Sequence, residues 1–119
     1  MEAKDAIKKV LDEMGCITLT QVQQDVIADM DRDWSHKTNE EVRMMCFSGL
    51  AEETGEVMGV AKRRARRLPS DVDKASDKHL VEELGDVLWY LAAVSAVCGC
   101  NLNKIWEENR AKLRDRYGD

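Results

Sequence analysis

The chain has 119 residues, of which 44% are hydrophobic and 34% charged, a composition typical of one folded domain. The formal net charge of −5 argues against a general nucleic-acid-binding protein, which usually presents a basic surface. One proline and seven glycines are few for a chain made of turns, so we expect long helices rather than a β-sandwich or barrel.

Two helices are predicted in the first third of the chain. The first covers about residues 4–14 and ends at Gly15. The second opens at Thr18, because Gln21 three residues later gives the pattern of a capping box. Apolar residues then recur at helical spacing, namely Val22, Val26, Ile27 and Met30. This stripe predicts that one side of the second helix faces the core.

The third predicted helix is the longest. It opens at Thr38, with Glu41 in the capping-box position, and continues to about Leu68, where Pro69 ends it. The polar stretch 69–78 has almost no apolar periodicity and is predicted to be a loop. No segment alternates with period two for long enough to make a strand, which leaves an all-α chain.

The fourth predicted helix, over about 77–97, is unusual because almost every residue in 87–97 is apolar or small. A helix that is apolar on all sides must be surrounded. We expect a partner subunit to cover it, the alternative being a central helix wrapped by its own chain. The fifth helix, capped by Asn101, covers about 102–117. The predicted fold is an all-α bundle of about five helices in one domain (1–119), completed by oligomerisation as a homodimer or homotetramer.

The N-terminal residues and the cysteines bear on location. No apolar signal-peptide core follows the charged first ten residues, and the longest uncharged run is shorter than the roughly 20 residues of a spanning helix. We therefore expect a cytoplasmic protein with no membrane partner. Cys98 and Cys100 lack a second cysteine or histidine pair, so burial near a helix end is favoured over a zinc or redox role.

Two acidic motifs carry the candidate chemistry. Glu53 and Glu56 are three residues apart, as are Glu83 and Asp86, so each pair shares one face of its helix. Apolar neighbours place these carboxylates toward the core, where burial without a partner is costly and a divalent cation would remove that cost. Oxygen ligands without cysteine or histidine suit Mg²⁺, or alternatively Mn²⁺. The competing interpretation is a solvated charged face.

Two further observations refine the interpretation of the acidic motifs. Neither His36 nor His79 lies in the Glu-x-x-His motif that a di-iron bundle requires. Glycines inside predicted helices cost roughly 1 kcal/mol each relative to alanine. Four of them lie in or near the motifs, at Gly49, Gly55, Gly59 and Gly85. Glycines that weaken a helix beside a cluster of charges favour a functional site over a solvated face.

Three sequence blocks in this order, residues 49–57, 82–93 and 109–117, resemble the MazG-like branch of the all-α nucleoside triphosphate pyrophosphohydrolases. The family's Glu-x-x-Glu and Glu-x-x-Asp are matched at Glu53, Glu56, Glu83 and Asp86. The resemblance covers about residues 19–117 and implies a helical bundle that assembles as a dimer or a pair of dimers. It also implies Mg²⁺-dependent cleavage of a nucleoside triphosphate between its α and β phosphates, which yields the monophosphate and pyrophosphate and serves nucleotide-pool sanitation or regulation.

The resemblance assigns expected roles near the acidic motifs. Either Glu52 or Glu53 would accept a proton from the attacking water as general base. Lys62 and Arg63 match a basic pair that follows the first acidic motif in relatives, and Arg63 could meet the triphosphate. Tyr90, one turn after Asp86, could contact the nucleotide or be a core tyrosine.

Further substrate contacts are expected outside the acidic motifs. The family match favours phosphate or sugar contacts from the last helix, at Asn109, Lys112 and Arg116, the alternative being a solvated helix face. Trp34, just before the third helix, could stack on a base or pack in the core.

The competing function is a non-enzymatic helical module that binds nucleic acid through the basic run 62–67. On a helix these basic side chains spread around the cylinder, and the chain is acidic overall, so nucleic acid is the less favoured partner.

Overall fold

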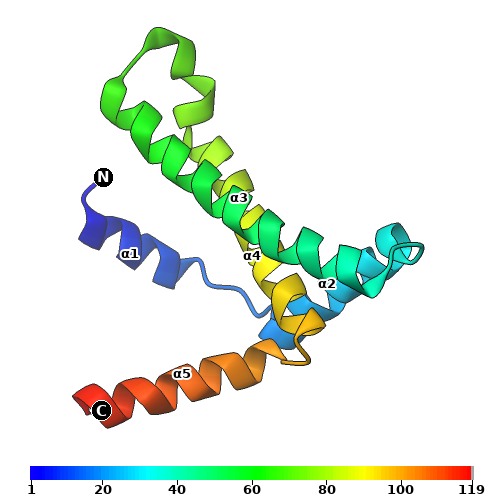
Figure 1. Cartoon of the computed structure of the whole chain (residues 1–119). Coiled ribbons are helices and arrows are strands. Elements are labelled where there is room, and N and C mark those ends of the chain that lie inside the picture. The colour runs from blue at the N-terminus through cyan, green and yellow to red at the C-terminus, as the bar shows by residue number, and fades with distance from the viewer. Residues whose placement is uncertain (119) are drawn as a thin grey trace.

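Five α-helices and two short 3₁₀ helices make up the computed structural model, which describes residues 1–118 and has no strand among them (Figure 1). The α-helices are α1 (Ala3–Asp12), α2 (Leu19–Trp34), α3 (Asn39–Arg66), α4 (Asp77–Val97) and α5 (Leu102–Tyr117). The 3₁₀ helices are η1 (Pro69–Asp71) and η2 (Asp73–Ala75). The predicted all-α fold class is confirmed.

Side-chain caps fix the helix starts. Thr38 and Glu41 form the complete capping box: the Glu41 N–H donates to Thr38 Oγ1 and the Thr38 N–H donates to Glu41 Oε1, both at 3.1 Å. Thr18 caps α2 in the same way, but the predicted second half of that box is absent, because the Gln21 side chain donates to Asp25 instead. Asn101 caps α5, as predicted.

The predicted loop 69–78 is more ordered than its polar sequence indicates, and this part of the prediction is wrong. Arg66 donates two parallel hydrogen bonds to the carboxylate of Asp71, the second at 2.8 Å, and Asp71 is buried. Arg64 donates to the Ala75 carbonyl (2.8 Å) and to Asp77 (2.9 Å). These pairings close the connection into η1 and η2, and none of them has a periodic signature in the sequence.

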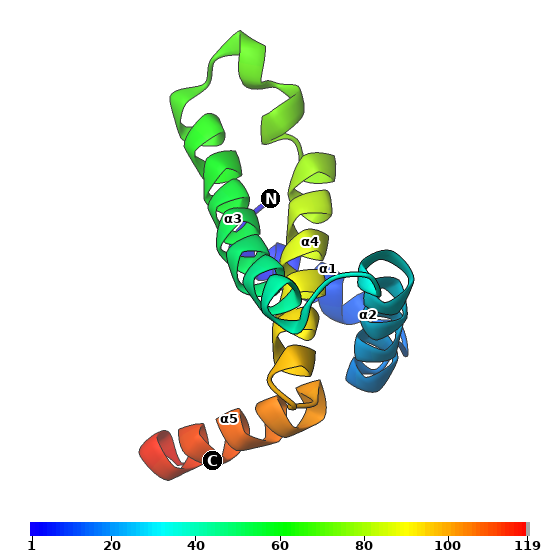
Figure 2. The same cartoon turned by 45° about the vertical axis from the view of Figure 1, so that its right-hand side comes forward.

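Helices α3 and α4 form a long antiparallel hairpin, and both views show them side by side (Figures 1 and 2). Helix α2 packs across the C-terminal half of α4. The buried core lies at this crossing and comprises Val26, Cys46, Ala92, Ala93 and Leu102. The packing extends to Trp89, whose indole N–H donates to Asp29 at 3.0 Å. The hairpin is the element that carries both acidic motifs.

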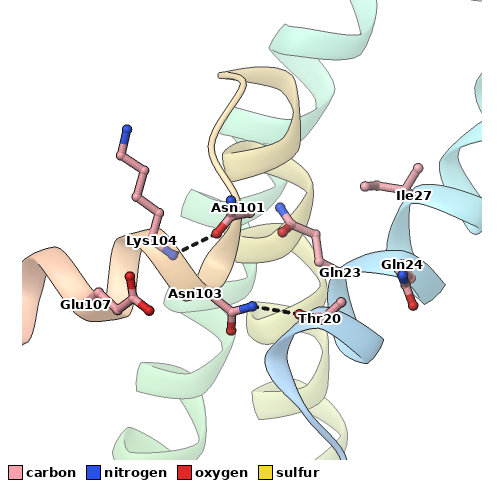
Figure 3. A pocket seen from close by; sticks show the side chains of 8 residues that line it. All are labelled: Thr20, Gln23, Gln24, Ile27, Asn101, Asn103, Lys104 and Glu107. Atoms are coloured by element: carbon pink, nitrogen blue, oxygen red, sulfur yellow. Dashed lines mark hydrogen bonds between the residues drawn. The ribbon is translucent and has the colours of Figure 1, made fainter.

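Helix α5 leaves α4 at 95° and is joined to α2 by the buried Gln23. The Gln23 amide donates to Ser95 (3.2 Å) and to the Cys100 carbonyl (3.0 Å), and it accepts the Leu102 N–H at 2.9 Å. A polar pocket opens beside this junction, where Asn103 donates to Thr20 (Figure 3). None of the predicted site residues lines this pocket.

The single chain leaves much apolar surface open. Its radius of gyration is 17.1 Å, against about 14 Å expected for a compact domain of this length. On α4, Leu88 and Leu91 are 42% and 41% exposed, although Ala92 and Ala93 are fully buried. Helix α1 is amphipathic and buries no residue. The chain by itself therefore does not surround α4, and the expected partner subunit stays a prediction.

Two remaining expectations concern membranes and cysteines. Among residues 1–118 no single helix is long and apolar enough to cross a membrane, although α4 and α5 meet that test as a bent pair. Cys98 is exposed and Cys100 is half-buried, so the expected burial is wrong for Cys98. Both lie just after the last turn of α4, on either side of Gly99, whose φ is +74°.

Candidate active site

The antiparallel pairing of α3 and α4 brings the two acidic motifs together. One carboxylate oxygen from each of Glu53, Glu83 and Asp86 lies within 4.8 Å of the other two. Glu53 and Glu83 are half-buried and Asp86 is exposed, so the cluster is open to solvent on one side. The three-residue spacing in α4 places Glu83 and Asp86 on the face that meets Glu53.

The electrostatics of this cluster reflect the crowding of its negative charges. The pKa of Glu53 is raised to about 7, first by burial, then by a hydrogen bond to Glu83 and by the negative charges of Asp86, Glu83 and Glu56. A carboxyl in this position holds a proton near neutral pH unless a cation replaces that proton. The arrangement therefore favours a bound cation over a free cluster of charges.

The donor set fits a hard divalent cation. It consists of carboxylate oxygens, and Asp86 leaves an exposed side where water or phosphate oxygens could complete the coordination. Mg²⁺ commonly uses one or two carboxylates and keeps several waters, and Mn²⁺ accepts the same ligands. Among the described residues this is the one group of acidic, histidine or cysteine side chains with metal-binding geometry.

Glu56 lies at the edge of this cluster, and Glu52 lies near Tyr90. Glu56 is exposed and its charge raises the pKa of Glu53, but its oxygens are outside the group of three. Glu52 is exposed as well, and its charge acts on Tyr90. The structure therefore brings together three of the four predicted ligands and places the fourth beside them.

Comparison with known protein families shows to which family the chain belongs. Residues 44–119, which include most of α3 and all of α4 and α5, match the MazG nucleotide pyrophosphohydrolase domain. The chain belongs to the MazG family. No curated protein and no solved structure matches the chain. Membership indicates a hydrolase with a nucleotide substrate, and the Glu53, Glu83 and Asp86 cluster is consistent with the divalent-metal site of a MazG domain.

Tyr90 packs inside the hairpin of the MazG domain, beside the acidic cluster. Its pKa is raised by burial and by the charges of Glu53, Glu52 and Asp86. The ring lies against the backbone of Gly49, which explains one of the helical glycines. Tyr90 is thus a packed residue near the carboxylates, which favours the core interpretation, and the expected nucleotide contact stays a prediction.

Trp34 packs at the end of α2 against Trp89. The two rings meet edge to face, with centroids 5.4 Å apart. Trp89 makes a second edge-to-face contact with Tyr90, at 5.0 Å. This aromatic row favours the packing role of Trp34 over an exposed stacking platform, although it connects Trp34 to the neighbourhood of the site through Tyr90.

Arg63, near the end of α3, folds back over the preceding turn of that helix, and its charge acts on Asp71 of η1. Its guanidinium covers Gly59, where an added Cβ would lie 3.3 Å from Nη1. Nη1 is buried without a hydrogen-bond partner. A buried, unpaired guanidinium nitrogen calls for an acceptor, and a phosphate oxygen is one that Arg binds well. Lys62, its neighbour, is exposed.

The predicted substrate contacts on α5 do not meet the acidic cluster within one chain. Asn109 is half-buried, and Lys112 and Arg116 are exposed. Both views show α5 pointing away from the α3–α4 hairpin (Figures 1 and 2). These residues could reach a site only through assembly or through a change in the direction of α5.

His79 is a feature of the site that the sequence motifs did not indicate. Its Nε2 lies 3.2 Å from Glu83 Oε1, and its Nδ1 lies 3.8 Å from Glu82 Oε2. The Glu-x-x-His motif does not include it, because His79 precedes Glu83 by four residues. That spacing places both side chains on one helix face and is the signal that could have found the pair.

Proposed function

We propose that this MazG domain is a Mg²⁺-dependent nucleoside triphosphate pyrophosphohydrolase. It cleaves the bond between the α and β phosphates, with water as the second substrate, and releases the nucleoside monophosphate and pyrophosphate. The observation that carries the proposal is the convergence of Glu53, Glu83 and Asp86 in a chain of the MazG family. Its cellular role would be the sanitation or regulation of cytoplasmic nucleotide pools.

Glu53, Glu83 and Asp86 would hold the cation, with Glu56 joining them at the edge of the cluster. When bound, Mg²⁺, or Mn²⁺ in its place, supplies positive charge to the phosphate oxygens and lowers the pKa of a coordinated water. The raised pKa of Glu53, about 7 without metal, reflects the same shortage of positive charge. A bound divalent cation would relieve it.

Glu52 or Glu53 would accept the proton of the attacking water. Glu53 lies within the cluster, and its pKa of about 7 in the metal-free protein would suit a general base as long as this carboxyl holds no cation. Glu52 is exposed and is not needed as a ligand in the group of three, so it is free to act as the base when Glu53 holds the cation. Loss of turnover with retained metal affinity in Glu52→Gln or Glu53→Gln would identify the base.

Two basic side chains of α3 are the proposed phosphate contacts. Arg63, through its unpaired Nη1, and the exposed Lys62 would bind the phosphate tail. Tyr90 would contact the nucleoside of the substrate. Trp34 packs against Trp89, which in turn packs against Tyr90 and would hold its ring in place.

For the contacts of Asn109, Lys112 and Arg116 we propose a second copy of the chain rather than a change in the direction of α5. Helix α5 points away from its own cluster, and exposed apolar residues on α4 and α5 are available to pack between copies, namely Leu84, Leu88, Leu91, Ile105 and Trp106. A homodimer or homotetramer would cover these residues and could bring α5 of one copy toward the cluster of another.

The nucleic-acid-binding alternative loses support from the structure. Arg64 and Arg66 of the basic run are engaged with Asp77, Ala75 and Asp71, which leaves Lys62, Arg63 and Arg67 for a ligand. A gel-shift titration over a range of salt concentrations separates the two functions. Tight, salt-sensitive binding without hydrolysis of any triphosphate would replace the enzyme proposal.

The experiment that tests the proposed function is a panel of ribo- and deoxyribonucleoside triphosphates, normal and damaged, incubated with the protein and Mg²⁺. Pyrophosphate release should be detected for at least one member. Absence of hydrolysis across the panel with Mg²⁺ and with Mn²⁺ would overturn the proposal.

A further inference from the structure

We propose that His79 is a positioning residue that fixes the carboxylate of Glu83 for cation binding. The inference rests on the proposed function, because it assumes that Glu83 is a ligand. It starts from the 3.2 Å contact between His79 Nε2 and Glu83 Oε1, in which both side chains are largely covered, with exposed fractions of 23% and 13%.

The backbone holds His79 where this contact can form. Ser76 caps α4, and its Oγ accepts the His79 N–H at 3.1 Å. The Ser76 hydroxyl donates in turn to the Asp73 carbonyl of η2 at 2.7 Å. His79 therefore sits in a first helical turn that is tied to the η2 connection, and the four-residue spacing aligns its ring with Glu83.

The contact opposes a repulsion that the cluster itself creates. Glu83 faces Glu53 and Asp86, whose charges favour moving its carboxylate away. The contact of His79 Nε2 with Oε1 holds the Glu83 side chain against this repulsion. Glu82 lies near the other ring nitrogen, with its Oε2 at 3.8 Å from Nδ1. The side chain of Glu83 is thus restrained before any cation arrives.

Partners of ligating carboxylates affect metal binding measurably. Their removal typically lowers metal affinity by about 10- to 100-fold. His79 contacts the carboxylate and need not contact the cation. Its loss should therefore lower the affinity for metal more than it lowers the rate of hydrolysis at saturating metal. This split distinguishes positioning from a direct part in the reaction.

The test measures Mn²⁺ binding by electron paramagnetic resonance, or by calorimetry, at one fixed pH. His79→Ala should raise the dissociation constant for Mn²⁺ by about tenfold or more. His79→Gln, whose amide N–H can reach Glu83, should bind Mn²⁺ close to wild type. The control is His36→Ala, an exposed histidine between α2 and α3, which should leave Mn²⁺ binding unchanged.

Activity measured against Mn²⁺ concentration gives a second readout. His79→Ala should need more Mn²⁺ for half-maximal hydrolysis and should approach the wild-type kcat at saturation. If the alanine variant melts at a much lower temperature, His79→Leu, which keeps the side-chain bulk, replaces it. Wild-type Mn²⁺ affinity in a folded His79→Ala or His79→Leu variant would overturn the role of His79 alone. Absence of Mn²⁺ binding in the wild-type protein would overturn both this role and the proposed metal site.

Discussion

The ring of Tyr90 occupies the space that a side chain at Gly49 would need. A Cβ built on Gly49 would lie 2.1 Å from Tyr90 Cε1, far inside any van der Waals contact. Since Gly49 is buried in α3, the two helices can approach at this level only without a side chain. The contact fixes the register of α3 and α4, and that register aligns Glu53 with Glu83 and Asp86.

Gly49→Ala should therefore destabilise the fold. Overpacking a core typically costs about 1–3 kcal/mol, which the better helix propensity of alanine, roughly 1 kcal/mol, offsets only in part. The matched control is Gly55→Ala in the same helix, where nothing lies within 4 Å and the free energy of unfolding should be unchanged or higher. Urea denaturation compares the two. Equal or greater stability of Gly49→Ala would mean that Tyr90 is not packed there.

Removing one ligand oxygen at a time tests the acidic cluster. Glu53→Gln, Glu56→Gln, Glu83→Gln and Asp86→Asn should each lower turnover by about a hundredfold or more and weaken Mn²⁺ binding. The folded state should persist, because each change removes a repelling charge. Glu40→Gln, an exposed acidic residue in the first turn of α3, is the control and should behave as wild type. Near-normal activity in any of the four variants would exclude that residue as a ligand.

The raised pKa of Glu53 predicts how stability depends on pH in the metal-free protein. The ordinary value is 4.5 and the folded value about 7, so between them the folded state binds more protons than the unfolded state. Stability from this group is complete below pH 4.5 and is lost as the pH rises through 7. The Tm with chelator should fall over this window, and Glu53→Gln should reduce that fall. If the Tm of the wild type rises over this pH range relative to that of Glu53→Gln, the excess of negative charge around this carboxyl is contradicted.

Assembly is tested by placing a charge on the exposed apolar surface of α4. Leu88→Glu should weaken a dimer or tetramer strongly, because the carboxylate would be buried without a partner, and activity should fall with it. Val72→Glu, exposed between η1 and η2, is the control and should assemble normally. Sedimentation at micromolar concentration measures both. A wild-type monomer of 13.5 kDa with full activity would show that the open face of α4 needs no partner.

The sequence predicted the parts of this structure that depend on local patterns. Thr38 and Glu41 indicate the start of α3 through capping chemistry, and Asn101 does the same for α5. The features it missed depend on contacts through space. The pairing of Arg66 with Asp71 shapes η1, and no periodicity records it. Likewise the direction of α5 follows from Gln23 on α2, far away in the sequence.

In the candidate site, too, local patterns were predictable and contacts through space were not. The three-residue spacing of the acidic motifs predicted that the carboxylates share helix faces, and the hairpin brings Glu53 to Glu83 and Asp86. Spacing could not separate Glu56, at the edge, from the other three, because that difference depends on the register of the helices. His79 was not predicted because its contact is with a carboxylate rather than within a known motif.

Product analysis is the most direct test of the proposed cleavage between the α and β phosphates. The protein is incubated with Mg²⁺ and the triphosphate that the panel identifies, and the products are resolved by phosphorus NMR, with and without excess chelator. We expect nucleoside monophosphate and pyrophosphate in equal amounts, and no products in chelator. Nucleoside diphosphate with orthophosphate, or undiminished hydrolysis in chelator, would contradict the proposed reaction.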